Sequence, residues 1–181
     1  GWTGRGGSVP SGHYIEYWPA LIDSKYITEK VHFEGETVDV VPTSQMDLEE
    51  IYYQKEPYKN KLPEIKNTKK INFGRLFGTR SGDKGGCANL GVWAKTSESY
   101  AFLYDFLTVE RLKELLPDVS QYEVERHELP NILSLNFYIH DILQDGVSSS
   151  TRLDGQAKSL GEYIRAKEID APDYLLEAIG G

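Results

Sequence analysis

Residues 70–96 read KINFGRLFGTRSGDKGGCANLGVWAKT, and the interpretation of the whole chain starts from this stretch. Two apolar runs, residues 71–77 and 90–94, flank a central segment that is rich in glycine and charge. β-branched, aromatic and long aliphatic side chains dominate both runs, which is typical of strands. The segment between them contains too many glycines for the interior of a regular element, so we expect a connecting loop.

The expected loop combines glycines with Arg80, Asp83, Lys84 and Asn89. Successive backbone N–H groups in such a loop can surround an anion, and the two cations would add positive charge. The alternative is a tight hairpin whose Arg80 and Asp83 bind backbone groups and whose Lys84 is solvated. The loop is not a P-loop, because Lys84 precedes the glycine pair and no Ser or Thr follows the lysine.

The composition indicates an acidic globular protein. A hydrophobic fraction of 39% is enough for a packed core, and a net charge of −8 argues against nucleic acid as a partner. We find neither an apolar run near the roughly 20 residues that span a bilayer nor a signal peptide. The single cysteine, Cys87, excludes an internal disulfide and fits a reducing compartment. We therefore predict a cytoplasmic protein that does not bind membranes.

The sequence divides into three segments. Residues 1–42 combine a glycine-rich start with short strands, namely an edge strand at 14–18 and a hairpin over 31–41. Residues 43–69 are dominated by charge, amide and proline, which predicts a linker with one helical candidate at 46–53. Residues 70–181 form the main domain. Because the chain begins with Gly1 and its only methionine is Met46, we expect a fragment or a subunit cut from a larger protein.

The main domain alternates strands with helices. A run at 132–143 fits both a strand and a helix, and its Asn131 start and Asp145–Gly146 end slightly favour the helix. Helices capped by Ser97 and Thr108 form either two short helices or one kinked helix. The remaining expected elements are strands at 121–129 and 147–153 and a final helix at 155–167, capped by Asp154. This order predicts an α+β protein built as a two-layer sandwich.

Outside the loop, three polar residues are candidates for a site. Asp154 and Lys158 are four residues apart at an expected helix start, where an ion pair would stabilise the helix. Alternatively, Arg152 and Lys158 face the loop across one cleft. Asn136 stands among apolar residues, so it either bonds a loop backbone or contacts a ligand.

No pattern identifies a catalytic centre. His127 and His140 lack the spacing of zinc ligands, so no metal site is predicted. Cys87 fits a small apolar role better than that of a nucleophile, and Ser81 lacks the G-x-S-x-G pattern. The catalytic residues, and whether the protein is an enzyme, stay open at this stage.

Several stretches resemble the C-terminal ferredoxin-fold domain of the acyclic terpene utilisation (AtuA) family. They are RSGDKGG at 80–86, ANLGV at 88–92, LT at 107–108, ELPN at 128–131, LNF at 135–137 and LDGQAKSLG at 153–161. The resemblance covers residues 70–170 in the family's order. It implies a ferredoxin-like sandwich with helices on one face of a mostly antiparallel sheet. Residues 1–41 resemble the end of the larger N-terminal AtuA domain.

The resemblance implies a role in the catabolism of branched, terpenoid acyl-CoA or carboxylate intermediates. A coenzyme A thioester would then be a substrate, and no cofactor is predicted. The alternative is a non-catalytic assembly module that docks a partner subunit or the N-terminal AtuA domain; a homo-oligomer is compatible with either. We predict that the anionic group is bound by Arg80, Ser81, Asp83, Lys84, Gly85, Gly86, Asn89, Asn136, Arg152 and Lys158.

Overall fold

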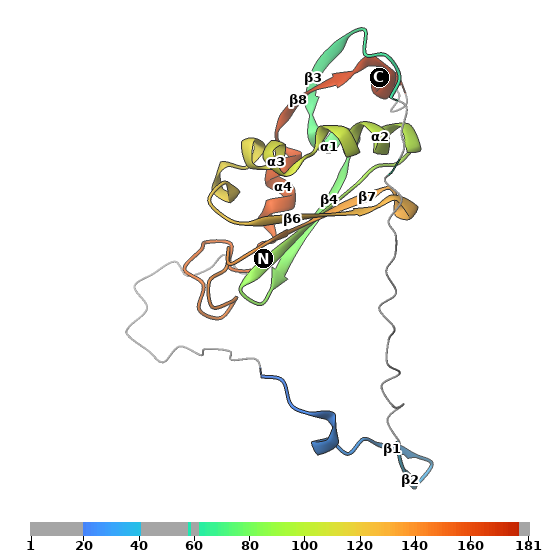
Figure 1. Ribbon diagram of the computed structural model, residues 1–181, viewed down its shortest axis with the longest axis vertical. Coiled ribbons are helices and arrows are strands. Elements are labelled where there is room, and N and C mark those ends of the chain that lie inside the picture. Colours follow the sequence, from blue (N-terminus) through green and yellow to red (C-terminus); the bar gives the residue numbers. More distant parts are fainter. Residues whose placement is uncertain (1–19, 41–57, 59–61, 178–181) are drawn as a thin grey trace. The chain divides into compact units, whose positions relative to one another are not determined.

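The computed structural model describes residues 20–40, 58 and 62–177 (Figure 1). They belong to two units, a segment within residues 18–57 and a larger domain. The strand predicted at 14–18 and the helix predicted at 46–53 lie outside the described residues. The predicted linker is described only at residues 58 and 62–69.

The first unit contains the predicted hairpin. Strands β1 (Lys30–Phe33) and β2 (Glu36–Asp39) pair antiparallel, after a short 3-10 helix at Ser24–Tyr26. The turn residues Glu34 and Gly35 both have positive φ, the backbone that a two-residue type I′ turn needs. Every described residue of this unit is exposed. A lone hairpin of this kind has no core of its own.

The domain is built on a four-stranded antiparallel sheet with the strand order β4-β5-β7-β6. Helices lie on one side of this sheet (Figure 1). A separate antiparallel ribbon pairs β3 (Thr68–Asn72) with β8 (Glu168–Pro172). The α+β sandwich with helices on one sheet face is therefore confirmed. The sheet strands are β4 (Gly78–Lys84), β5 (Cys87–Trp93), β6 (Val124–Leu129) and β7 (Ser134–Ile139); the helices are α1 (Phe73–Leu76), α2 (Ser97–Phe106), α3 (Val109–Leu115), α4 (Ser159–Arg165) and α5 (Asp173–Glu177).

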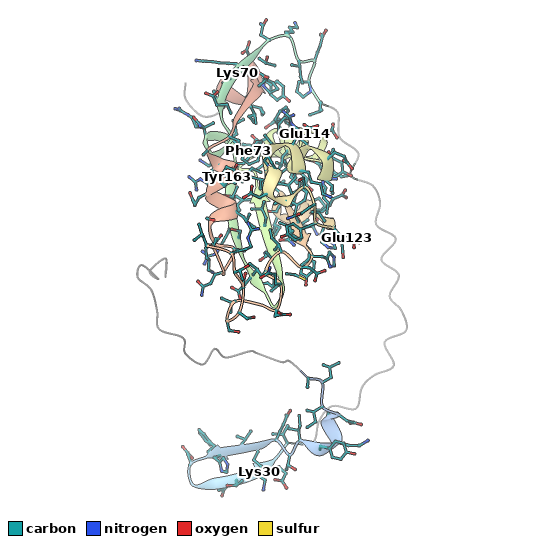
Figure 2. All side chains as sticks on the ribbon, turned by 90° about the vertical axis from the view of Figure 1, so that its left-hand side faces the viewer. Lys30, Lys70, Phe73, Glu114, Glu123 and Tyr163 are labelled. Carbon is teal, nitrogen blue, oxygen red and sulfur yellow. The ribbon has the colours of Figure 1, made fainter. Side chains whose placement is uncertain are left out.

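The core lies between the sheet and the helices. Alternate residues of the two central strands point into it, and all of them are fully buried. Phe73 lies among the packed side chains of the domain (Figure 2). Burying one side chain of this size contributes about 1.5–3 kcal/mol, so the core stabilises the stacking of the two layers. The inward residues are Ala88, Leu90 and Val92 on β5 and Leu135, Phe137 and Ile139 on β7.

The stretch after the sheet hairpin forms two helices, one of the two arrangements that the sequence allowed. The hydroxyl of Thr108 accepts a hydrogen bond from the backbone of Arg111 (3.1 Å) and caps α3, as predicted. Helix α2 is capped by Thr96, one residue before the predicted Ser97, through a 3.1 Å hydrogen bond from the backbone of Ser99.

Three element predictions were wrong. Residues 71–77 are not one strand, because β3 ends at Asn72 and the short helix α1 follows; Phe73 and Leu76 lie one turn apart and both enter the core. The segment 132–143 contains strand β7 instead of a helix, because the alternation of its apolar residues puts every second side chain into the core. Residues 147–153 form turns instead of a strand. The helix predicted at 155–167 is α4, which begins at Ser159.

The segment predicted to be a glycine-rich loop is instead a tight hairpin, which is the backbone arrangement of the alternative interpretation. Strand β4 continues to Lys84 and β5 resumes at Cys87, so only Gly85 and Gly86 form the turn. Gly85 has a φ of 64° and Gly86 does not have positive φ, as a type II′ turn requires. A Cβ on Gly86 would overlap the carbonyl oxygen of Gln144. Gly85 is therefore explained by its backbone conformation, and Gly86 by the close approach of the backbone at Gln144.

Within the described ranges, no helix is both long enough and apolar enough to cross a lipid bilayer.

Candidate functional site

The two faces of β4 have different surroundings. Thr79 and Ser81 point toward helix α4 and are buried, whereas Arg80 and Gly82 belong to the opposite face. We call that opposite face, which the described helices leave uncovered, the open face. The neighbouring strands add Asn89 and Gly91 from β5 and Asn136 and Tyr138 from β7, in register.

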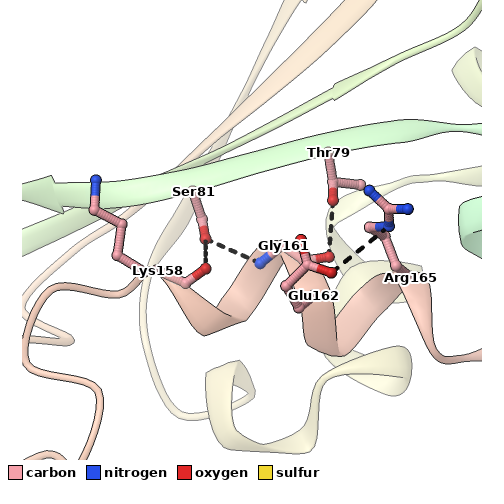
Figure 3. A network of polar contacts seen from close by, with 6 residues as sticks. All are labelled: Thr79, Ser81, Lys158, Gly161, Glu162 and Arg165. Atoms are coloured by element: carbon pink, nitrogen blue, oxygen red, sulfur yellow. Dashed lines mark hydrogen bonds and ion pairs between the residues drawn. The ribbon is translucent and has the colours of Figure 1, made fainter. Parts of the chain in front are cut away.

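Helix α4 is fixed to β4 by hydrogen bonds from two hydroxyl groups (Figure 3). The Thr79 hydroxyl donates to the carbonyl oxygen of Gly161 (2.8 Å). The Ser81 hydroxyl accepts from the Gly161 N–H (2.9 Å) and donates to the carbonyl oxygen of Lys158 (3.1 Å). These bonds satisfy backbone groups at the start of the helix. They hold the backbone of Lys158 beside the edge of the sheet.

Asp154 fixes the same helix start from the other direction. Its carboxylate accepts hydrogen bonds from the backbone N–H groups of Lys158 (2.9 Å) and Ser159 (2.7 Å). It also accepts one from the Ser159 hydroxyl (2.6 Å). Asp154 is not the N-cap residue that the sequence predicted, because the helix begins at Ser159 and Lys158 is its N-cap. The Asp154 carboxylate nevertheless binds the backbone N–H groups at the helix start.

Lys158 and Asn89 converge over Gly82. The Lys158 ammonium lies 3.6 Å, and the Asn89 amide oxygen 3.9 Å, from the position that a Cβ on Gly82 would occupy. The Asn89 amide donates to the amide oxygen of Asn136 (3.2 Å), which in turn lies 3.9 Å from the Cβ position of Gly91. A cation and two linked amides thus surround two glycines on the open face.

The fold does not require glycine at these two positions. Neither Gly82 nor Gly91 has positive φ, and a Cβ on either would make only ordinary contacts. By contrast, a Cβ on Gly78 would overlap the indole of Trp93. A glycine inside a strand often marks a place where a ligand approaches the backbone closely. Gly82 and Gly91 fit that explanation better than one based on folding.

A pocket of about 250 Å³ lies beside β4, and Lys158 contributes to it. Its charged residues are Arg80, Lys158 and Glu162, so two cations oppose one carboxylate. The Glu162 carboxylate also lies 3.8 Å from the guanidinium of Arg165, which weakens its negative field (Figure 3). The pocket is thus net positive in a chain with a net charge of −8. The lining residues are Thr79, Arg80, Ser81, Trp93, Lys158, Gly161 and Glu162.

Four predicted site residues come together. Arg80 and Lys158 line the pocket, and Asn89 and Asn136 form the amide pair beside it. Ser81 also lines the pocket, but its hydroxyl is engaged with α4.

The other predicted residues lie elsewhere. The Lys84 ammonium donates to the carbonyl oxygen of Asp83 (2.9 Å), next to the glycine turn. Arg152 lies in the loop before α4, where its backbone N–H donates to the Ser150 hydroxyl (3.3 Å), and it does not line the pocket. The structure therefore moves the candidate site from the glycine turn to the middle of the β4–β5 hairpin.

Sequence reasoning missed four residues of the pocket, namely Thr79, Trp93, Gly161 and Glu162. Thr79 and Gly161 are recognisable only once β4 and α4 are known to touch. Trp93 could have been noticed, because it has the opposite parity to the buried Leu90 and Val92 on the same strand. It is 42% exposed and belongs to the open face.

A second polar cluster lies on the core side of the sheet, away from the pocket. Arg126 donates to the Glu128 carboxylate (3.1 Å) and to the carbonyl oxygen of Tyr104 (2.6 Å). Burial raises the pKa of the nearby Tyr100 to about 12, and the charge of Glu128 adds to this effect. The cluster is half-buried and acts as part of the core.

Histidines lie on the open face at its other edge. The Glu125 carboxylate contacts His140 (2.6 Å) and His127 (3.2 Å). Across the described parts of the chain, no group of three or more His, Cys, Asp or Glu side chains is arranged to hold a metal ion.

The fold defines a ferredoxin-like α+β domain with a cationic pocket at one sheet edge. A family model described as the AtuA ferredoxin-like domain matches residues 71–170, which is more than half of the chain. The chain belongs to this AtuA family. A search of curated proteins found no match, and a search of solved structures found none either.

Proposed function

We propose that this domain binds the anionic group of a branched acyl-CoA or carboxylate intermediate, in the terpenoid catabolism with which AtuA proteins are associated. The observation that carries the proposal is the position of the Lys158 ammonium, 3.6 Å from where a Cβ on Gly82 would lie. Arg80 adds a second cation to the same pocket. The fold does not need Gly82, which supports a role in ligand approach.

The hydrogen bond between the two amides determines which amide group is left to donate to a ligand. Asn89 donates to the oxygen of Asn136, so the Asn136 amide nitrogen can donate to an oxygen of the ligand. A carboxylate or a thioester carbonyl accepts such a hydrogen bond, and Lys158 supplies positive charge beside it. Hydrogen bonds to charged groups contribute about 1.5–3 kcal/mol each. Arg80 and Lys158 are exposed, so we expect binding that weakens as salt is added.

The proposal is tested by thermal unfolding of the full chain with isovaleryl-coenzyme A, isovalerate and free coenzyme A. A ligand that binds only the folded state stabilises it by about 2.7 kcal/mol at a hundred times its Kd. We expect the unfolding temperature to rise with ligand concentration. Lys158→Gln should remove this rise, whereas Lys95→Gln, a change at another exposed lysine, should preserve it.

Two results would contradict the proposal. One is a folded chain whose unfolding temperature does not respond to any of the three ligands. The other is a response that Lys158→Gln and Lys95→Gln leave equally intact, since the ligand would then bind away from the pocket.

A further inference from the structure

We infer that the ligand of this pocket is amphiphilic, with its anionic head at Lys158 and an apolar body that lies along β4 against Trp93. This inference rests on the proposed function and adds the surface that holds the apolar body of the ligand. It is carried by one pocket that has charged side chains and a half-exposed indole in its lining.

Trp93 is held as a fixed platform. Its indole lies against the bare Cα of Gly78, where a Cβ would overlap the ring atoms. Gly78 and Trp93 are also direct partners in the β4–β5 register. The ring is therefore packed on one side by backbone, yet 42% of the residue stays exposed. An aromatic surface that is both rigid and exposed can bury an apolar group with little loss of side-chain entropy.

The distance along β4 between Lys158 and Trp93 sets the length of the ligand. Gly82, beneath the Lys158 ammonium, and Gly78, beneath Trp93, are four residues apart on β4. At about 3.3 Å per residue, these positions are roughly 13 Å apart. Arg80 lies between them on the same face and can cover the body of the ligand with its aliphatic stem. A short carboxylate bound at Lys158 would not reach Trp93.

The open face becomes more apolar toward the Trp93 end. In the strand register, Trp93, Ser134 and Leu129 form one row across β5, β7 and β6. Leu129, like Trp93, is 42% exposed. The next rows toward Lys158 hold the amides of Asn136 and Asn89. The row of Trp93 and Leu129 is thus the more apolar end of the face, although Tyr138 lies opposite Asn89 at the other end.

The test compares butanoate with octanoate by NMR titration of the ¹⁵N-labelled full chain. Each fully buried methylene raises affinity by about fourfold, so octanoate should bind at least about tenfold more tightly than butanoate. Trp93→Leu should reduce this gap severalfold, because it should weaken octanoate binding much more than butanoate binding. Trp93→Phe, which keeps an aromatic ring, should retain most of the gap. Lys158→Gln should weaken both carboxylates by a similar factor.

The outcomes separate the two proposals. Equal affinities for butanoate and octanoate, both lost in Lys158→Gln, would overturn the amphiphilic ligand and leave the anion site standing. A difference between the octanoate and butanoate affinities that Trp93→Leu does not change would also overturn the amphiphilic ligand. Binding of either carboxylate that is indifferent to Lys158→Gln would overturn the anion site itself, and the present inference with it.

Discussion

The hydroxyl of Ser81 accepts a 2.9 Å hydrogen bond from the backbone N–H of Gly161, and this bond joins the edge strand β4 to helix α4. The same hydroxyl donates to the carbonyl oxygen of Lys158. A side chain on the core face of the strand therefore positions the residue whose ammonium lies over Gly82 on the opposite face. Ser81 therefore contributes both to the stability of the domain and to the position of Lys158 in the candidate site.

Ser81→Ala should lower both stability and ligand affinity. The substitution leaves the buried N–H of Gly161 and the carbonyl of Lys158 without their partner, which costs about 1–3 kcal/mol. Urea unfolding measures this loss, and Ser148→Ala in an exposed turn is the matched control. A free energy of unfolding within about 0.5 kcal/mol of the parent chain, as for an ordinary surface substitution, would contradict the anchoring role.

Two glycine-to-alanine changes should have opposite effects on stability. A Cβ on Gly161 would lie 3.2 Å from the Thr79 hydroxyl, which cannot retreat because it is bonded to the helix backbone. Gly161→Ala should therefore destabilise by about 1–3 kcal/mol, more than the gain of about 1 kcal/mol in helix propensity.

Gly82→Ala should instead be neutral or stabilising, by up to about 1 kcal/mol, because its Cβ makes only ordinary contacts. It should nevertheless weaken binding of isovaleryl-coenzyme A, since the methyl group occupies the floor of the site. Urea unfolding and calorimetry on the same samples test both statements. A destabilised Gly82→Ala chain would show that the fold itself requires this glycine.

Glu162→Gln should strengthen anion binding. Glu162 is the single carboxylate among the residues lining the pocket, and its removal leaves Arg80 and Lys158 unopposed there. We expect a severalfold decrease in the Kd for isovaleryl-coenzyme A at low salt, shrinking as salt screens the charges. Glu114→Gln, which changes an exposed residue of α3, provides the control. An equal gain in both variants would mean that only the net charge matters.

Stability should fall at alkaline pH because of Tyr100. Its pKa is about 12 in the folded domain, raised mainly by burial, and about 10 in an unfolded chain. Between these values the unfolded chain loses the proton while the folded domain keeps it. The stabilising contribution of Tyr100 is therefore fully present below about pH 10. It is lost at up to about 1.4 kcal/mol per pH unit as the pH rises from 10 to about 12.

Tyr100→Phe isolates that effect. The buried Tyr100 hydroxyl has no hydrogen-bond partner within the described residues, so its removal should cost little at neutral pH. Urea unfolding across the alkaline range should give a shallower decline for this variant. Some decline should persist, because burial also raises the pKa of Tyr104 and Tyr174. An unchanged slope would contradict the assignment to Tyr100.

The sequence predicted the fold class and the hairpins where local patterns determine structure. Thr108 marks a helix start through its own side chain, and Glu34–Gly35 forms a turn through its own backbone. The segment 132–143 was misjudged because its apolar residues fit two periods, and only pairing with β5 and β6 selects the strand. The local pattern allowed both structures there, and the tertiary pairing determined which one formed.

The candidate site could be predicted only as a set of residues, without its arrangement. Asn89 and Asn136 are 47 positions apart, and only the β5–β7 register brings their amides together. The glycines were attributed to one loop, although Gly85 and Gly86 serve a turn and Gly82 lies within a strand. Which glycine is required by the backbone depends on φ and on neighbours that no local pattern contains.

The most direct test of the site is an NMR titration of the ¹⁵N-labelled chain with isovaleryl-coenzyme A, following the backbone amides of Gly82 and Gly85. These two glycines belong to the same hairpin, but only Gly82 lies beneath the Lys158 ammonium. The account predicts saturable shifts at Gly82, Asn89 and Gly91, with little change at Gly85, and their loss in Lys158→Gln. Shifts that centre on Gly85 and Gly86, with Gly82 unmoved, would contradict it and return the site to the turn.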